Sequence, residues 1–311
     1  MSRSLLRWAP VAVVVAALLA GSVAPALADD LGSYLDEAEA SSYAGRQATW
    51  STLDGDTTFG VVSVEHAGSM TMVEGASGDT MIGAGRVFGS SGAVVVHGWS
   101  AGSLSDRYQM AEPEAVKRLG RDATLLTIVE GDAVRARIWL DDASSAPLGS
   151  EVYEGDGSLF RLSYMLDFTP NPTRLYAALR DGGGDFDVAL PSDRSSLPPT
   201  ADGYRRLDVY TGPGDVVQAF FTDGLFSFSV FEVEGSVDTA PFSDGSTVEI
   251  NGSKYLQMLT PSEVWVVWKA GSMSYVLVGD LPPDHLAEVL GELPHPDAAN
   301  LFQRIWRGLF G

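Results

Sequence analysis

The sequence predicts an α+β protein that is mainly β: a curved antiparallel sheet, open like a half-barrel and covered by helices, followed by a small α+β domain. Three observations predict this fold. Strand-like runs follow one another through the first half of the chain, helical periodicity is scarce there, and a segment rich in Gly, Pro, Ser and Asp, 181–203, precedes a second set of strands. An antiparallel sheet of many strands curls, and helices cover one of its faces.

Residues 1–28 have the pattern of a secretory signal peptide. Two arginines precede an apolar run over 8–20, and the small-residue triplet 26–28 forms a cleavage site. The alternative is a transmembrane anchor, which needs about 20 uninterrupted apolar residues. Three residues interrupt this segment: Pro10, Gly21 and Pro25. We therefore expect cleavage and a mature chain outside the cytoplasmic membrane, in the periplasm or an equivalent envelope space.

The first domain is expected over 29–180. Gly155-Asp156-Gly157 lies between two strand-like runs and predicts an antiparallel hairpin. Helical pattern is confined to 30–40 and a short 112–119. Strand-like runs are expected at 43–50, 59–65, 70–73, 93–97, 125–129, 134–141 and 160–168.

The second domain is expected over 204–296, after the linker 181–203. Asp223-Gly224 between apolar runs predicts a tight hairpin with Gly224 at positive φ. Residues 297–311 carry Leu, Phe, Ile and Trp on one helical stripe, which predicts an amphipathic helix that packs on its own domain, docks a partner or lies on a membrane. The other elements are strands at 205–210, 216–222, 225–233, 264–269 and 273–278, and a helix that begins near residue 282.

Charge and cysteine content exclude several classes of protein. The chain has 41 Asp and Glu against 20 Lys and Arg, a formal charge of −21, and loss of 1–28 with its two arginines makes this −23. Such a polyanion is repelled by nucleic acids and anionic lipid, and it attracts a cationic partner segment; the same charge also serves solubility. The absence of cysteine excludes disulfides, thiolate metal ligands and a cysteine nucleophile.

The sequence offers one catalytic candidate. Residues 98–102 match G-x-S-x-G, with Ser100 as the serine of an α/β-hydrolase elbow. No helix pattern follows at once, and strand follows strand through 120–170, so we treat the match as a loop. The four histidines are isolated and show no ligand spacing: His66, His97, His285 and His295. We expect no enzyme activity, no metal and no cofactor.

Three segments resemble the RseB/MucB family of sigma-E factor regulatory proteins. Residues 222–231, TDGLFSFSVF, are similar to the family's S-D-G-L…S-V-F strand pair. Residues 136–141, ARIWLD, followed by Leu148, Gly157 and Phe168, resemble its LW-LD…G-x-L…FT hairpin, and residues 275–282, YVLVGDLP, resemble its closing strand. The segments keep the family order across most of the mature chain.

The resemblance implies a regulator of an extracytoplasmic sigma factor. Such a regulator binds the extracytoplasmic part of a single-pass anti-sigma factor and shields it from the protease that begins its destruction. It also implies a LolA-like first domain, a half-open barrel around an apolar cavity that senses a lipid. The sequence does not decide whether the protein forms a homo-oligomer. The alternatives are lipid or lipoprotein carriage without sigma-factor control, and the Ser100 hydrolase.

Two sets of site residues follow. A hairpin can offer its edge to a partner by strand addition. We expect partner binding at Asp223, Gly224, Leu225, Phe228, Val230 and Phe231. Alternation along the first-domain strands places another set on the inward face, where the residues line a lipid cavity or pack as core. These are Val61, Met70, Met72, Ile138, Leu140, Phe160, Leu162 and Tyr164.

Overall fold

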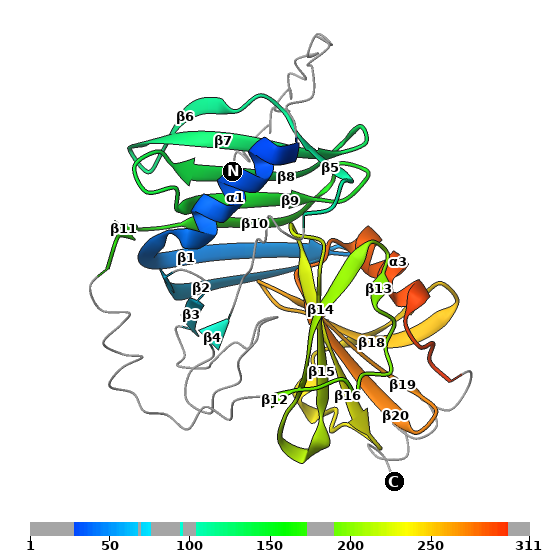
Figure 1. Cartoon of the computed structure of the whole chain (residues 1–311). Coiled ribbons are helices and arrows are strands. Elements are labelled where there is room, and N and C mark those ends of the chain that lie inside the picture. Colours follow the sequence, from blue (N-terminus) through cyan, green and yellow to red (C-terminus); the bar gives the residue numbers. More distant parts are fainter. Residues whose placement is uncertain (1–27, 68–69, 76–93, 96–103, 173–189, 298–311) are drawn as a thin grey trace, which may run out of the picture.

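The computed structural model describes residues 28–67, 70–75, 94–95, 104–172 and 190–297. Within these residues the chain forms two antiparallel sheets, neither of which closes on itself, and two α-helices (Figure 1). This confirms the predicted fold class.

The first sheet has the strand order β4-β3-β2-β1-β10-β9-β8-β7-β5 in the described part of the chain, with β11 beside β1 and β6 beside β7. The hairpin predicted around Gly155-Asp156-Gly157 is confirmed as β9–β10. The strands are β1 (Ser42–Leu53), β2 (Asp56–Ala67), β3 (Met70–Gly75), β4 (Val94–Val95), β5 (Tyr108–Met110), β6 (Glu114–Arg118), β7 (Arg121–Glu130), β8 (Ala133–Asp141), β9 (Pro147–Tyr153), β10 (Leu159–Met165) and β11 (Thr169–Pro170).

The second sheet has the order β12-β14-β15-β16-β20-β19-β18-β17, with β13 beside β14. Two of its short strands, β12 and β13, come before residue 204. The strands are β12 (Leu190–Pro191), β13 (Thr200–Ala201), β14 (Tyr204–Thr211), β15 (Val217–Thr222), β16 (Ser227–Glu234), β17 (Ser246–Ile250), β18 (Ser253–Leu259), β19 (Val264–Ala270) and β20 (Met273–Gly279), and two 3-10 turns are η2 (Pro213–Asp215) and η3 (Ala240–Phe242).

Helix α1 (Ala28–Ala40) lies across one face of the first sheet, which we call the concave face (Figure 1). Leu31, Leu35 and Ala38 recur at helical spacing, and each is almost completely buried. The helix predicted over 30–40 is therefore confirmed, and it covers the sheet as expected.

One hydrophobic core runs through both sheets. Helix α3 (Pro283–Glu292) begins at two prolines, which suit the first turn of a helix, and it packs on the second sheet. The core joins residues of α1, both sheets and α3 in one continuous cluster, which includes Leu31, Leu126, Phe160, Phe228, Leu277 and Leu286. The two sheets therefore share their apolar interior.

The helix predicted over 112–119 is wrong, because this segment forms β6 and pairs with β7. The cause is the turn that joins them. Leu119 and Gly120 have φ of 53° and 72°, so both central residues are left-handed, as in the type I′ turns that close hairpins. A helix could not continue through two such residues.

The Asp223-Gly224 hairpin forms, with a longer loop than predicted. Thr222 pairs with Ser227, so the loop has four residues, 223–226. Gly224 has φ of 92°, as expected. Ser100, most of 93–97, residues 181–189 of the linker and nearly all of the tail helix 297–311 lie outside the described residues.

Candidate functional site

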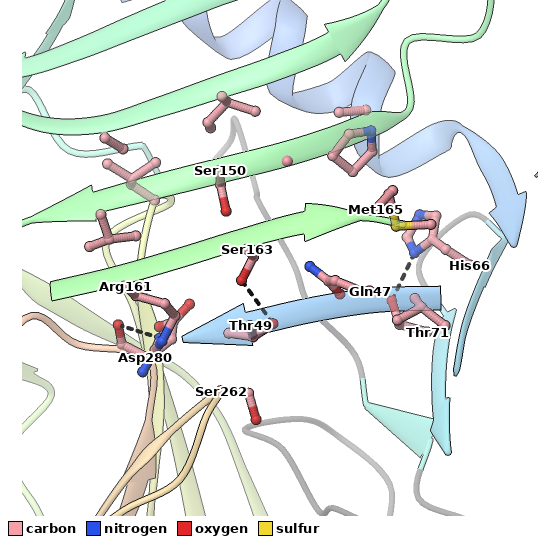
Figure 2. A pocket seen from close by; sticks show the side chains of 18 of the residues that line it. Gln47, Thr49, His66, Thr71, Ser150, Arg161, Ser163, Met165, Ser262 and Asp280 are labelled. Atoms are coloured by element: carbon pink, nitrogen blue, oxygen red, sulfur yellow. Dashed lines mark hydrogen bonds between the residues drawn. The ribbon is translucent and has the colours of Figure 1, made fainter. Parts of the chain in front are cut away.

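A cavity of about 190 Å³ lies between the concave face of the first sheet and the loops of the second sheet (Figure 2). The end of α1 contributes Ala38 and Glu39 to its wall. The second sheet contributes Leu225, Phe226, Ser262 and Asp280, from loops next to β16, β19 and β20. The cavity is below the range of about 300–1,000 Å³ typical of small-molecule sites.

Polar side chains occupy much of the cavity wall. The Ser163 hydroxyl donates to Thr49 Oγ1 at 3.1 Å (Figure 2). Other polar groups on the wall are Gln47, Thr71, Ser150 and Ser262, and apolar ones are Val64, Ala136, Ile138, Val152 and Met165. About half of the lining residues are therefore polar, whereas the resemblance implies an apolar barrel.

The buried Arg161 and the half-buried Asp280 meet at one end of the cavity. The Arg161 guanidinium donates from Nε to Ser51 Oγ at 2.9 Å and from Nη1 to the Asp280 carbonyl at 3.3 Å. Burial lowers the pKa of Arg161 to about 10 and raises the pKa of Asp280 to about 6. The Asp280 carboxylate accepts a hydrogen bond from the Ser227 backbone at 2.7 Å, so the pair joins β10 to β16 and β20.

His66 occupies the opposite end as a neutral ring. Its Nε2 lies 2.9 Å from the Glu39 carbonyl, an acceptor only, so Nε2 carries the proton and Nδ1 accepts from the Thr71 hydroxyl at 2.8 Å. Burial lowers the pKa of His66 and so favours this neutral form. The ring stacks on Tyr43 with centroids 4.9 Å apart. His66 is therefore a packed, hydrogen-bonded residue of the wall.

The structure brings one of the eight predicted lipid-cavity residues, Ile138, to the cavity wall. Leu140 and Phe160 are buried in the shared core instead. The side chains of Met70 and Met72 lie outside the described part of the structure.

The remaining three, Val61, Leu162 and Tyr164, lie on the convex face, away from the cavity. In β10, a β-bulge between Leu159 and Arg161 places Leu162 and Tyr164 on this face. Phe160 and Arg161 are both buried, and beyond them the odd-numbered residues face inward. Tyr164 instead stacks on Trp50, with centroids 5.1 Å apart.

Most of the predicted partner-binding residues are buried. Leu225 is 4% exposed, and Asp223, Phe228 and Val230 are 1% exposed or less; Gly224 is buried too, and Phe231 is half-buried. The prediction that a partner adds a strand at this hairpin is wrong. In this fold β15 pairs with β14 and β16, and β16 also pairs with β20. Both strands are interior, so neither has a free edge.

The hairpin instead joins the two sheets. The Tyr108 hydroxyl of β5 donates to Asp223 Oδ2 at 2.5 Å, and the Ser105 backbone donates to the Asp223 carbonyl at 2.7 Å. Asp223 Oδ1 accepts from the Leu225 and Phe226 backbone at 3.0 and 2.8 Å. Burial raises the pKa of Asp223, against the effect of these donors.

Charged residues close the same junction on the α3 side. Arg135 Nη1 lies 2.8 Å from Asp284 Oδ2, and Glu130 Oε2 lies 3.0 Å from both Arg135 Nε and His285 Nε2. The Tyr204 hydroxyl lies 2.7 Å from His285 Nδ1. Burial lowers the pKa of His285. These pairs, in which Arg135 and His285 are buried and the acids are partly exposed, link the two sheets.

Sequence reasoning missed Arg161, Asp280 and the junction charges. Arg161 reads as an outward residue in an alternating strand, and only the bulge turns it inward. Asp280 has a weak signal, an acid two residues after the apolar run 275–278. Within the described residues there is no cluster of His, Asp and Glu that fits a metal ion.

These features define an open, antiparallel two-sheet protein with a cavity where its sheets meet. Among solved structures, the crystal structure of MucB is similar to it, with a TM-score of 0.51 and 19% sequence identity over 86% of this chain and 97% of MucB. A complex of MucA and MucB from Pseudomonas aeruginosa gives a TM-score of 0.47 and 19% identity over 87% and 99%. The chain has the RseB/MucB-like fold. No protein-family model and no curated protein sequence matches it.

Proposed function

We propose that this protein is an extracytoplasmic regulator that binds the extracytoplasmic segment of a single-pass anti-sigma factor and so controls its proteolysis. The observation that carries the proposal is the two-sheet fold, which matches MucB over nearly the whole of that protein. The three segments similar to the RseB/MucB family, at 136–141, 222–231 and 275–282, support it, as does the signal-like sequence at 1–28.

The hairpin around Asp223 contributes to binding indirectly. Its buried members hold the second sheet against the first through Tyr108, so their replacement alters the surface that both sheets present. Phe231 alone of the six proposed residues is half-buried and able to touch a partner. We infer that Asp223, Gly224, Leu225, Phe228 and Val230 set the geometry of the partner surface.

The partner segment carries positive charge in this proposal. The mature chain has a formal charge of −23, which speeds association with a cationic segment and makes it sensitive to salt. The protein acts in the envelope space after export. Within the described residues, no helix is long and apolar enough to cross a membrane.

Lipid sensing or lipid carriage is the second candidate, favoured by the apolar half of the cavity wall around Ile138 and Met165. The volume of about 190 Å³ argues against a long acyl chain in this conformation. Native mass spectrometry of the exported protein under mild conditions tests this candidate. Recovery without any acyl species removes it.

Affinity capture tests the main proposal. The mature chain, 29–311, is used as bait on detergent-solubilised membranes of the cells that make it. We expect a single-span protein with a cationic extracytoplasmic segment in the eluate, lost at high salt. A matched bait, Asp223→Ala, loses the Tyr108 hydrogen bond across the junction and should recover less. An eluate with no anti-sigma-like single-span protein contradicts the proposal.

A further inference from the structure

The second sheet has an apolar face turned away from α3, which we call the outer face. Val267, Val276 and Val278 form its centre and are buried. In the described part of the chain, neither α1 nor α3 contributes to this cluster; Val237 and Phe242 do, and the Phe242 ring lies 5.8 Å from Trp265. Half-buried residues surround the centre: Phe231, Leu256, Met258 and Trp265.

The last described residue lies at one end of this face. The Asp297 backbone donates to the Lys269 carbonyl at 3.0 Å, and the Gly271 backbone donates to Asp297 Oδ1 at 3.0 Å. Lys269 lies near the end of β19, and Gly271 belongs to the turn that joins β19 to β20. These two strands carry Trp265, Val267, Val276 and Val278. Residue 298 therefore starts beside the hairpin that forms the outer face.

The remaining segment is long enough to cover the face. Fourteen residues follow Asp297, and as a helix they would span about 21 Å. Val278 is seven residues from Gly271 along β20, about 23 Å at the rise of a strand. A helix that turns back along the hairpin from Asp297 would thus lie over nearly all of the apolar residues of β19 and β20.

The chemistry of the segment matches the face. On a helix, Leu301, Phe302, Ile305, Trp306, Leu309 and Phe310 share one side. The opposite side carries Arg304 and Arg307, and residues 298–311 contain no acid. The loop at the rim of the outer face presents the exposed carboxylates of Asp238 and Asp244. The apolar side of the helix would contact the apolar outer face, and its arginines would lie near the acids of the rim loop.

We propose that residues 300–310 dock as an amphipathic helix on the outer face of the second sheet. In this arrangement the tail covers the outer face of its own chain. Any other protein that binds the outer face must first displace it.

Cysteine cross-linking tests this directly, because the chain contains no native cysteine. The full mature chain carries Met258→Cys, on the outer face, together with Ile305→Cys, on the apolar side of the tail. We expect a short bismaleimide to join the two within one molecule, seen as a cross-linked peptide in monomers. The matched control pairs Ile305→Cys with Ser63→Cys, an exposed position on β2, and should stay unlinked.

Three outcomes overturn the proposal: no cross-link in the test pair, equal cross-linking in the control pair, or cross-links only between molecules, which would place a second copy on the face. A variant that ends at Asp297 provides an independent readout. We expect it to remain folded by circular dichroism and to bind the dye ANS several-fold more strongly than the full chain, because its outer face is uncovered. Unchanged dye binding in the folded variant also overturns the proposal.

Discussion

The Asp280 carboxyl is a half-buried acid that lowers stability when it ionises. Its pKa is about 6 in the folded chain, against a usual value of 3.8. The folded state therefore holds this proton more tightly than the unfolded state. The resulting stabilisation is complete below about pH 4 and is lost as the pH rises through about 6, at a cost of about 3 kcal/mol at most.

Asp280→Asn tests this sign. The amide keeps an oxygen for the Ser227 backbone and cannot ionise, so the variant should be more stable than the parent at pH 7.5 and no more stable at pH 4. Urea unfolding of both proteins at several pH values measures the difference between their free energies of unfolding. His285, whose pKa is lowered by burial, contributes the opposite pH dependence to both proteins, so its contribution cancels in that difference. Asp244→Asn, at an exposed carboxylate, is the control. A difference between Asp280→Asn and the parent that does not change with pH would contradict the buried-acid account.

Gly224 is the residue that requires a left-handed backbone in the loop between β15 and β16. Its φ of 92° suits glycine and disfavours a β-branched residue. We expect Gly224→Val to lower the free energy of unfolding by about 1 kcal/mol or more. Gly212→Ala has an ordinary φ of −101°, and its added Cβ would lie 3.8 Å from the Val216 carbonyl oxygen, an ordinary contact, so it should cost less. Equal melting temperatures for the Gly224 variant and the parent would rule out this role.

At the scale of the element, the β6–β7 turn holds a residue that does not suit it. Leu119 adopts φ of 53° and is 44% exposed, so its side chain gains little from burial. Asparagine tolerates this backbone better. We expect Leu119→Asn to stabilise the protein by about 0.5 kcal/mol or more, and Leu119→Val to destabilise it. Chemical denaturation ranks the three proteins, and the reverse order would refute the turn assignment.

Alternation and turn residues predict most elements of this fold from the sequence. The β9–β10 and β19–β20 hairpins, α1 and α3 all carry strong local signals, and the structure confirms them. The errors have local causes that alternation does not contain. The left-handed backbone at Leu119 forms a hairpin turn, so the segment expected to be a helix is a strand. The bulge before Arg161 reverses which residues of β10 face inward.

At the scale of the molecule, the junction between the sheets decides both stability and site. The site depends on pairs far apart in the chain, such as Tyr108 with Asp223 and Arg161 with Asp280, whose meeting no sequence pattern reports. The Asp223 hairpin forms as predicted, but its residues are mostly buried and link the two sheets, so they present no free strand edge. Of the proposed lipid-cavity residues whose side chains the structure describes, only Ile138 lines the cavity between the sheets.

Tyr108→Phe probes this junction. The variant removes the donor to the buried Asp223 Oδ2, and an unsatisfied buried acceptor costs about 1–3 kcal/mol. Because one core runs through both sheets, we expect a single calorimetric transition at a lower temperature. Tyr153→Phe, at a hydroxyl that donates to Glu151 near the surface, is the matched control with a small effect. Two separate transitions in the parent would contradict a shared core.

The central proposal is that the two-sheet unit binds an anti-sigma factor. The most direct test is calorimetric titration of residues 29–311 with the extracytoplasmic domain of a single-span anti-sigma factor from the same cells. The account predicts saturable binding that weakens as salt rises, because the mature chain carries a charge of −23. Absence of binding at low salt, with both proteins folded, would contradict it.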